Sequence, residues 1–165
     1  MSLAELGEAW LAAWSGGDPQ AFAPLCAVDV QYRDPLIAQP LRGARAVGEH
    51  AAQLWAGVPD ARLELAGPAP ARDGALALPW SLRGTHSQSL GDFPATGRRL
   101  ALDGIFYCEL DGGHSTAEAD RRLRAVRGFF DLYEAGTQLG LLPARGTPGE
   151  RALLLLQGFG LRAGG

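Results

Sequence analysis

The chain contains no lysine and no asparagine, and all fifteen of its basic residues are arginines. Without lysine it can form neither a Schiff base nor the phosphate-binding loop that ends in lysine. Acidic residues outnumber basic ones and the formal net charge is −3, so we expect no nucleic-acid partner. No apolar run approaches the length of a membrane span, and we expect no membrane partner either.

The chain has only two cysteines. Cys26 and Cys108 are too few for a disulfide framework, and with no cluster of histidines we expect no metal site. The N-terminal segment carries Glu5 and Glu8 and no basic residue ahead of an apolar run, which is unlike a secretory signal. We therefore expect a protein of the reducing cytoplasm. Its 165 residues, 47% of them apolar and 20% charged, fit one globular domain.

Helical patterns come first along the chain. Apolar residues recur at helical spacing over residues 3–14, and Gly16 and Gly17 end the pattern. Asp18 followed by Pro19 predicts a short helix through Cys26, because an aspartate cap and a proline at the first position favour a helix start. Residues 30–33 look extended, and a third helix is predicted over 44–56, with His50, Leu54 and Trp55 on or near its inner face.

Four strands follow, over 61–65, 76–86, 100–110 and 123–131, where apolar and polar residues alternate. Gly104 suggests a bend or bulge in the third of them. Helices followed by strands predict an α+β fold: N-terminal helices packed on a strongly curved, antiparallel or mixed sheet, which forms a cone with a central pocket. We assign 1–143 to this single domain and 144–165 to a C-terminal extension with room for a short helix. The extension could cover the pocket mouth, build a dimer contact or simply pack.

The most informative residue is Asp131, which directly follows Phe129 and Phe130. Its strand alternation places it on one face with Leu123 and Ala125, and therefore inward. A carboxylate in apolar surroundings tends toward a raised pKa, suited to a general acid or base. The alternative is a structural aspartate that pairs with an arginine or caps a helix beginning near Leu132.

A set of short motifs, spread from Trp10 to Pro143, resembles the SnoaL-like polyketide cyclases of the nuclear transport factor 2-like superfamily. Each motif is weak alone, but their order and spacing are fairly specific. They include Trp10 and Trp14 before Gly17-Asp18, Asp29-Val30, Tyr32, Asp34-Pro35, Arg42-Gly43, Pro59-Asp60, Gly84-Thr85-His86, the run from Phe93 to Arg98, Gly104, Phe130-Asp131 and Gln138 to Leu141.

The resemblance implies a cofactor-free intramolecular aldol cyclisation in an aromatic-lined pocket. The family's acid/base aspartate matches Asp131. His86, at the end of an apolar strand face, also matches the family; an imidazole suits proton transfer or a hydrogen bond to a ligand oxygen, and the alternative is a histidine with structural hydrogen bonds alone. The implied partner is a small apolar or aromatic molecule. Family members commonly pair through their sheets, so the resemblance also implies a homodimer. The superfamily hosts isomerases, hydrolases, dehydratases and non-catalytic binders on one scaffold, so its fold leaves the reaction open.

Asp34 is the third catalytic candidate. It precedes Pro35 and resembles the aspartate-proline that supplies the general base of ketosteroid isomerases. Those enzymes stabilise the enolate with a tyrosine and a second acid, and here Trp10 and Phe106 stand at those positions. Steroid isomerisation by that mechanism is disfavoured. Asp34 could equally line the pocket or cap a turn. Limonene-epoxide hydrolases need an asparagine that this chain lacks.

Large aromatic residues are numerous for one small core, and most must belong to it. An apolar cavity with a few polar groups is typical of a small-molecule site. The sequence leaves open three readings: a cofactor-independent lyase or isomerase for an apolar carbonyl compound, a non-catalytic ligand-binding domain, and a partner-binding or dimerisation module. The expected pocket-lining residues are Trp10, Trp14, Tyr32, Trp55, Trp80, Phe93, Phe106 and Phe129.

Overall fold

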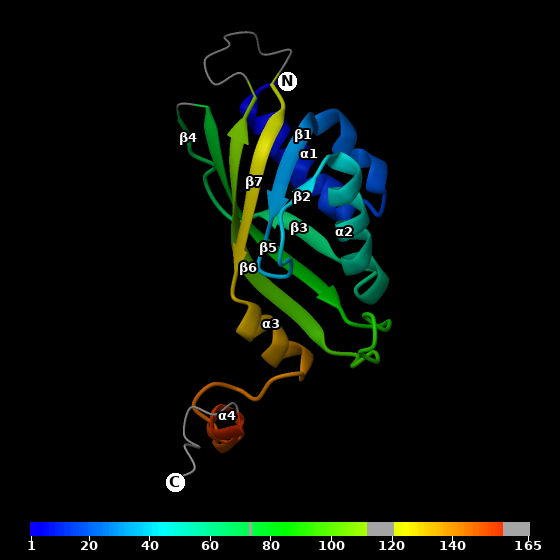
Figure 1. Ribbon diagram of the computed structural model, residues 1–165, viewed down its shortest axis with the longest axis vertical. Helices are drawn as coiled ribbons and strands as arrows, with labels where there is room; N and C mark the ends of the chain where they lie inside the picture. Colours follow the sequence, from blue (N-terminus) through cyan, green and yellow to red (C-terminus); the bar gives the residue numbers. More distant parts are fainter. Residues whose placement is uncertain (73, 112–120, 157–165) are drawn as a thin grey trace.

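The computed structural model describes residues 1–72, 74–111 and 121–156. Two helices, α1 (Leu3–Ser15) and α2 (Ala44–Gly57), cover one face of a curved sheet, and the 3-10 helix η1 (Pro19–Leu25) lies between them in sequence. Two further helices, α3 (Leu132–Leu139) and α4 (Pro148–Leu154), follow the last strand (Figure 1). This arrangement confirms the predicted α+β class.

The sheet has seven strands in the order β2-β1-β7-β6-β5-β3, with β4 paired to β5. Among the described strand pairs, that between β1 and β7 alone is parallel, so the sheet is mixed. The parallel pair is possible because α2 and the long antiparallel strands intervene between its two members. The strand bounds are β1 Cys26–Arg33, β2 Leu41–Arg42, β3 Arg62–Leu65, β4 Ala71–Arg72, β5 Ala75–Thr85, β6 Arg99–Leu110 and β7 Leu123–Phe130.

Both N-terminal helices begin at a side-chain cap, of which the sequence had predicted the one at Asp18. Ser2 and Glu5 form a reciprocal capping box at the start of α1, and Asp18 caps η1 with Pro19 at its first position. The segment after Pro19 is 3-10 rather than α, and it ends at Leu25 because Cys26 already pairs with β7. The predicted helix through Cys26 is one residue too long.

Helix α2 lies close to the N-terminal helices. A Cβ at Gly48 would lie 2.2 Å from the carbonyl oxygen of Pro19, so only glycine permits this approach. The indole Nε1 of Trp55 donates a 2.7 Å hydrogen bond to the carbonyl of Trp14 at the end of α1. These contacts fix the inner face of α2 opposite the sheet.

A one-residue bulge in β7 reverses the alternation predicted for that strand. Leu110 pairs with Leu123, but Glu109 pairs with Ala125, so Arg124 is an extra residue. Beyond it the inward side chains are those of Val126 and the even-numbered positions. Phe129 is therefore exposed on the outer face, and the expectation that it lines the pocket is wrong.

Gly104 does not mark a bulge, because the register of β6 is regular on both sides at this position. A Cβ here would lie 2.3 Å from the ring of Trp80 and 2.5 Å from the carbonyl oxygen of Phe129. Glycine thus leaves space for the Trp80 indole, which packs across the strand against the inner face.

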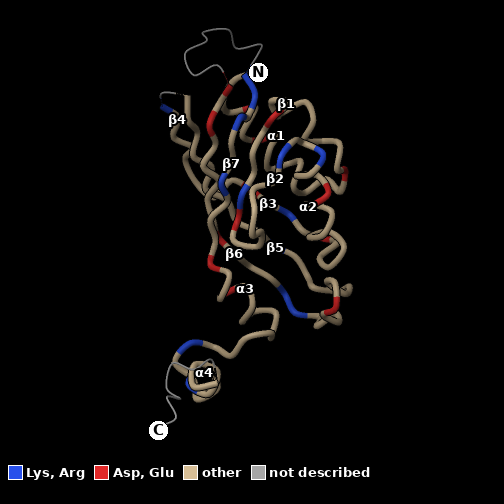
Figure 2. Tube along the Cα trace, viewed as in Figure 1, with Lys and Arg blue, Asp and Glu red and all other residues tan. Residues whose placement is uncertain are grey.

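The C-terminal part extends away from the sheet. Helix α4 has no buried residue and lies beyond α3 in Figure 1. Acidic and basic residues are interspersed along the trace in Figure 2 rather than separated by sign. Among the described residues, no helix is both long enough and apolar enough to cross a membrane.

Candidate active site

A cavity of about 530 Å³ lies between the inner face of the sheet, α2, α3 and the segment that joins β5 to β6. Its walls are mostly leucine and aromatic side chains. Among the residues that the structure describes, the titratable side chains that line it are Tyr32, Asp34, His50 and His86. Few polar groups in an otherwise apolar cavity are typical of a site for a small organic molecule.

Asp34 lies directly after β1, where the chain turns at Pro35, and it is only 8% exposed. Three donors surround its carboxylate. The hydroxyl of Tyr32 donates to Oδ2 at 2.9 Å, the backbone N–H of Leu36 donates to Oδ1 at 2.8 Å, and His50 Nε2 lies 2.7 Å from Oδ2. Asp34 therefore both caps a turn and lines the cavity, the two roles between which the sequence did not decide.

The electrostatics of this cluster favour an ionised carboxylate. Burial pushes the pKa of Asp34 upward, but the hydrogen bond and charge of His50, with the donors Leu36 and Tyr32, outweigh burial and leave the pKa below its ordinary value. Burial, together with the neighbouring Asp34 carboxylate, raises the pKa of Tyr32 well above its usual range. Tyr32 is therefore a neutral donor to an anionic Asp34.

His50 was expected on the inner face of its helix but was not predicted as a site residue. It comes from the middle of α2, and its side chain is 10% exposed. Its ring packs edge-on against Trp14, with 6.1 Å between centroids. The spacing of sixteen residues between Asp34 and His50 carries no motif; the inward position of a lone histidine was the only available signal.

His86 lies at the end of β5 and is fully buried against the cavity. Its Nδ1 accepts from the backbone N–H of Thr96 at 3.3 Å and lies 3.0 Å from the Thr96 hydroxyl oxygen. That oxygen accepts from the N–H of Arg98 at 3.4 Å, which leaves its hydrogen free to donate to Nδ1. The ring proton of neutral His86 is therefore on Nε2.

Three N–H donors at the cavity have no hydrogen-bond partner among the described residues. They are His86 Nε2, Trp14 Nε1 and Trp80 Nε1, all buried. A buried donor without a partner costs about 1–3 kcal/mol, so such groups need an explanation.

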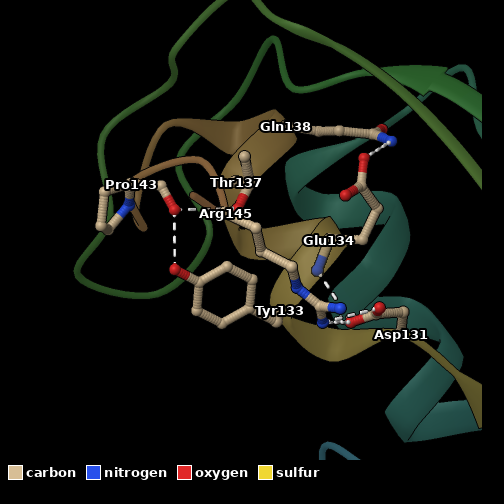
Figure 3. Close-up of polar contacts among 7 residues, drawn as sticks. All are labelled: Asp131, Tyr133, Glu134, Thr137, Gln138, Pro143 and Arg145. Atoms are coloured by element: carbon tan, nitrogen blue, oxygen red, sulfur yellow. Dashed lines mark hydrogen bonds and ion pairs between the residues drawn. The ribbon is translucent and has the colours of Figure 1, made fainter. Parts of the chain in front are cut away.

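Asp131 does not lie in the cavity. It caps α3, where its Oδ1 accepts from the N–H of Glu134 at 3.0 Å, and both its oxygens accept from Arg145 at 3.1 and 2.9 Å (Figure 3). The side chain is 49% exposed, and the cap hydrogen bond, with help from Arg145, lowers its pKa. The predicted inward position is wrong because the β7 bulge reverses the face; the alternative, a capping and paired aspartate, is what the structure has.

The predicted pocket-lining aromatics divide into two groups. Trp14, Tyr32, Trp80, Phe93 and Phe106 line the cavity. Trp10 is fully buried behind it, packed edge-on against Phe22 and Phe106, and Trp55 is half-buried and engaged with Trp14. Phe129, on the outer face, completes the three that do not line it.

Helix α3 closes one side of the cavity with Leu132, Ala135 and Leu139. The side-chain amide of Gln138 anchors it, because it exchanges hydrogen bonds of 2.8 and 2.9 Å with both backbone groups of Ala101 on β6. Among the described residues there is no group of three or more histidine, cysteine, aspartate or glutamate side chains placed to hold a metal ion.

Several solved structures share this architecture. TsrD from Streptomyces laurentii is 23% identical with a TM-score of 0.69 over 86% of this chain and 99% of its own. A proposed polyketide cyclase from Acidithiobacillus ferrooxidans is 23% identical with a TM-score of 0.67 over 85% and 98%. At this level of identity these similarities establish the ketosteroid isomerase-like fold and no activity.

A third similar structure holds a ligand. It is a protein of ketosteroid isomerase-like fold from Catenulispora acidiphila in complex with trimethylamine, 21% identical with a TM-score of 0.67 over 89% of this chain and 100% of its own. No functionally curated protein matches the chain in sequence. The family model of the SnoaL-like domain, however, matches residues 8–118, more than half of the chain. The protein therefore belongs to the SnoaL-like family.

Proposed function

We propose that this protein is a cofactor-independent lyase or isomerase that acts on a small apolar carbonyl compound by acid/base catalysis. The observation that carries the proposal is the hydrogen-bonded cluster of Tyr32, Asp34 and His50 in an otherwise apolar cavity. Groups that can exchange a proton, isolated from water beside apolar walls, are suited to proton transfer at carbon.

In this proposal the Asp34–His50 pair takes the proton from the carbon next to the substrate carbonyl. The enolate oxygen that results needs preorganised donors, and His86 Nε2 is a buried donor without a partner among the described residues. The same enolate can regain a proton at another carbon, which is isomerisation, or attack a second carbonyl, which is aldol cyclisation. The cyclase name of one structural relative supports the second outcome.

Proton exchange at a ketone tests the proposal without knowledge of the natural substrate. The probe is 2-tetralone, an apolar bicyclic ketone, whose loss of α-protons in D₂O is followed by NMR. We expect the wild-type protein to accelerate exchange over the protein-free rate, and Asp34→Asn to lose at least about 10-fold of that acceleration. Asp103→Asn is the matched control, because it removes an exposed carboxylate on β6 outside the cavity. Equal rates for the two variants would contradict the proposal.

A second candidate function is the binding of an apolar or aromatic metabolite without catalysis. The observation that favours it is that the Asp34 carboxylate already has three hydrogen-bond donors around it. These donors and the lowered pKa of Asp34 also suit a structural group. This function predicts that 2-tetralone binds, seen as quenching of tryptophan fluorescence, and that exchange stays at the protein-free rate in every variant.

A further inference from the structure

We infer that His50 is the catalytic base and that its Nδ1 is the atom that accepts the proton, while Asp34 positions it. This inference rests on the proposed function and deepens it, because it assigns the proton to one atom of the cluster. The sequence pointed instead to Asp34 as the base, by its resemblance to the aspartate-proline of ketosteroid isomerases.

The contacts of Asp34 leave it poorly suited to take a proton from carbon. Oδ2 is shared between the Tyr32 hydroxyl and His50 Nε2, and Oδ1 is engaged by the N–H of Leu36. All three donors stabilise the ionised form, in which the carboxylate is a weak base. To reach a substrate, Asp34 would have to give up one of these bonds.

The contacts of His50 have the opposite consequence. An ionised carboxylate can only accept a hydrogen bond, so the 2.7 Å contact fixes the proton of neutral His50 on Nε2. Nδ1 then carries a lone pair, and it makes no hydrogen bond with any residue that the structure describes. A carboxylate that holds an imidazole in one tautomer also stabilises the imidazolium that forms when the ring accepts a proton.

The other titratable groups at the cavity do not offer a free lone pair of this kind. His86 uses Nδ1 to accept from Thr96 and carries its proton on Nε2, so neither of its nitrogens offers a free lone pair. Tyr32 is neutral and donates to Asp34. Among the described titratable residues that line the cavity, His50 Nδ1 is thus the uncommitted base.

The proton step balances within this set of residues. The Nδ1 lone pair of His50 bonds to a proton on the carbon next to the carbonyl, and the carbon–hydrogen electrons form the carbon–carbon double bond of the enolate. The carbonyl electrons move to oxygen, where His86 Nε2–H can donate. The imidazolium of His50 lies beside the Asp34 carboxylate and later returns its proton to the product.

The tautomer of His50 can be measured directly in the unliganded wild-type protein. The chain has three histidines, and long-range ¹H–¹⁵N NMR distinguishes a protonated ring nitrogen from a bare one. We expect neutral His50 to show a protonated Nε2 and a bare Nδ1. A neutral His50 protonated on Nδ1, or a ring that stays doubly protonated through neutral pH, would overturn the inference even if the protein catalyses exchange.

The 2-tetralone exchange assay then tests whether His50 or Asp34 is the catalytic base. We expect His50→Gln to lose about 100-fold or more of the acceleration, because glutamine can still donate to Asp34 but cannot accept a proton. Fluorescence quenching by 2-naphthol, a planar analogue of the enol, checks that the variant keeps its cavity.

Failure of this inference is distinguishable from failure of the proposed function. If wild type accelerates exchange, and His50→Gln keeps most of that rate while it binds 2-naphthol normally, Asp34 is the base and the inference is wrong. If wild type gives no acceleration at all, the proposed function itself fails.

Discussion

His50 and Asp34 come from different elements, α2 and the turn after β1, yet His50 Nε2 and Asp34 Oδ2 lie only 2.7 Å apart inside an apolar cavity. This contact couples the N-terminal helical layer to the parallel strand pair of the sheet. Among the described residues that line the cavity, Asp34 has the one buried carboxylate. The function, the pH dependence and part of the stability of the protein depend on this pair.

The first prediction concerns the stability of the fold in acid. The folded-state pKa of Asp34 lies below the unfolded value of about 3.9, so its stabilisation is present above that pH and disappears as the pH falls through the folded value. We expect Asp34→Asn to be about 1.5–3 kcal/mol less stable than wild type near neutral pH, because hydrogen bonds to a charged group are lost.

Urea unfolding at a series of pH values checks this prediction. The gap in the free energy of unfolding between wild type and Asp34→Asn should stay constant down to about pH 4 and shrink as the pH falls from there toward about 2. A gap that stays constant over this range would show that Asp34 has no pKa shift on folding.

The sequence predicted the fold well because most of its signals are local. The capping residue Asp18, the helical spacing before Gly16 and the alternation around Trp80 each depend on near neighbours, and the order of the SnoaL-like motifs indicates how these elements follow one another. The site was predicted less well because it depends on contacts distant in sequence. No local pattern joins Asp34 to His50, and the extra residue Arg124 becomes visible only when Glu109 and Leu110 are paired with β7.

The second prediction concerns Asp131. We expect Asp131→Ala to lower the melting temperature, because α3 loses its cap and Arg145 loses its partner, while 2-tetralone exchange per folded molecule is unchanged. Asp131→Asn should melt closer to wild type, since asparagine is also a good cap. Thermal melts and the exchange assay provide both readouts. If both variants are fully folded and still lose exchange activity, Asp131 takes part in the mechanism and the prediction is wrong.

The third prediction concerns the close approach at Gly104. We expect Gly104→Ala to destabilise the protein by about 1–3 kcal/mol, because a methyl group would collide with the Trp80 ring and the Phe129 carbonyl. Gly67→Ala is the control: its Cβ would meet only Pro79 at 3.9 Å, an ordinary contact, and surface changes of this kind stay within about 0.5 kcal/mol. Equal urea midpoints for the two variants would contradict the packing described.

The fourth prediction concerns the outer face of the sheet. Ile105 and Phe129 are register partners on β6 and β7, and with Tyr107 they expose an apolar surface. Since an exposed apolar surface on a sheet is typical of a protein–protein contact, we expect a homodimer that buries this surface. Light scattering should give a dimer mass for wild type and a monomer mass for Ile105→Ser/Phe129→Ser. A monomeric wild type at micromolar concentration would contradict this prediction.

The most direct test of the central claim is a crystal structure of the protein with 2-naphthol. If the cavity of Asp34, His50 and His86 is the reactive site, the naphthol ring lies among Trp14, Trp80 and Phe106, with its oxygen about 3 Å from His86 Nε2 and a ring carbon next to that oxygen facing His50 Nδ1. A naphthol bound outside the cavity, or one whose ring carbons face neither His50 nor Asp34, would contradict the claim.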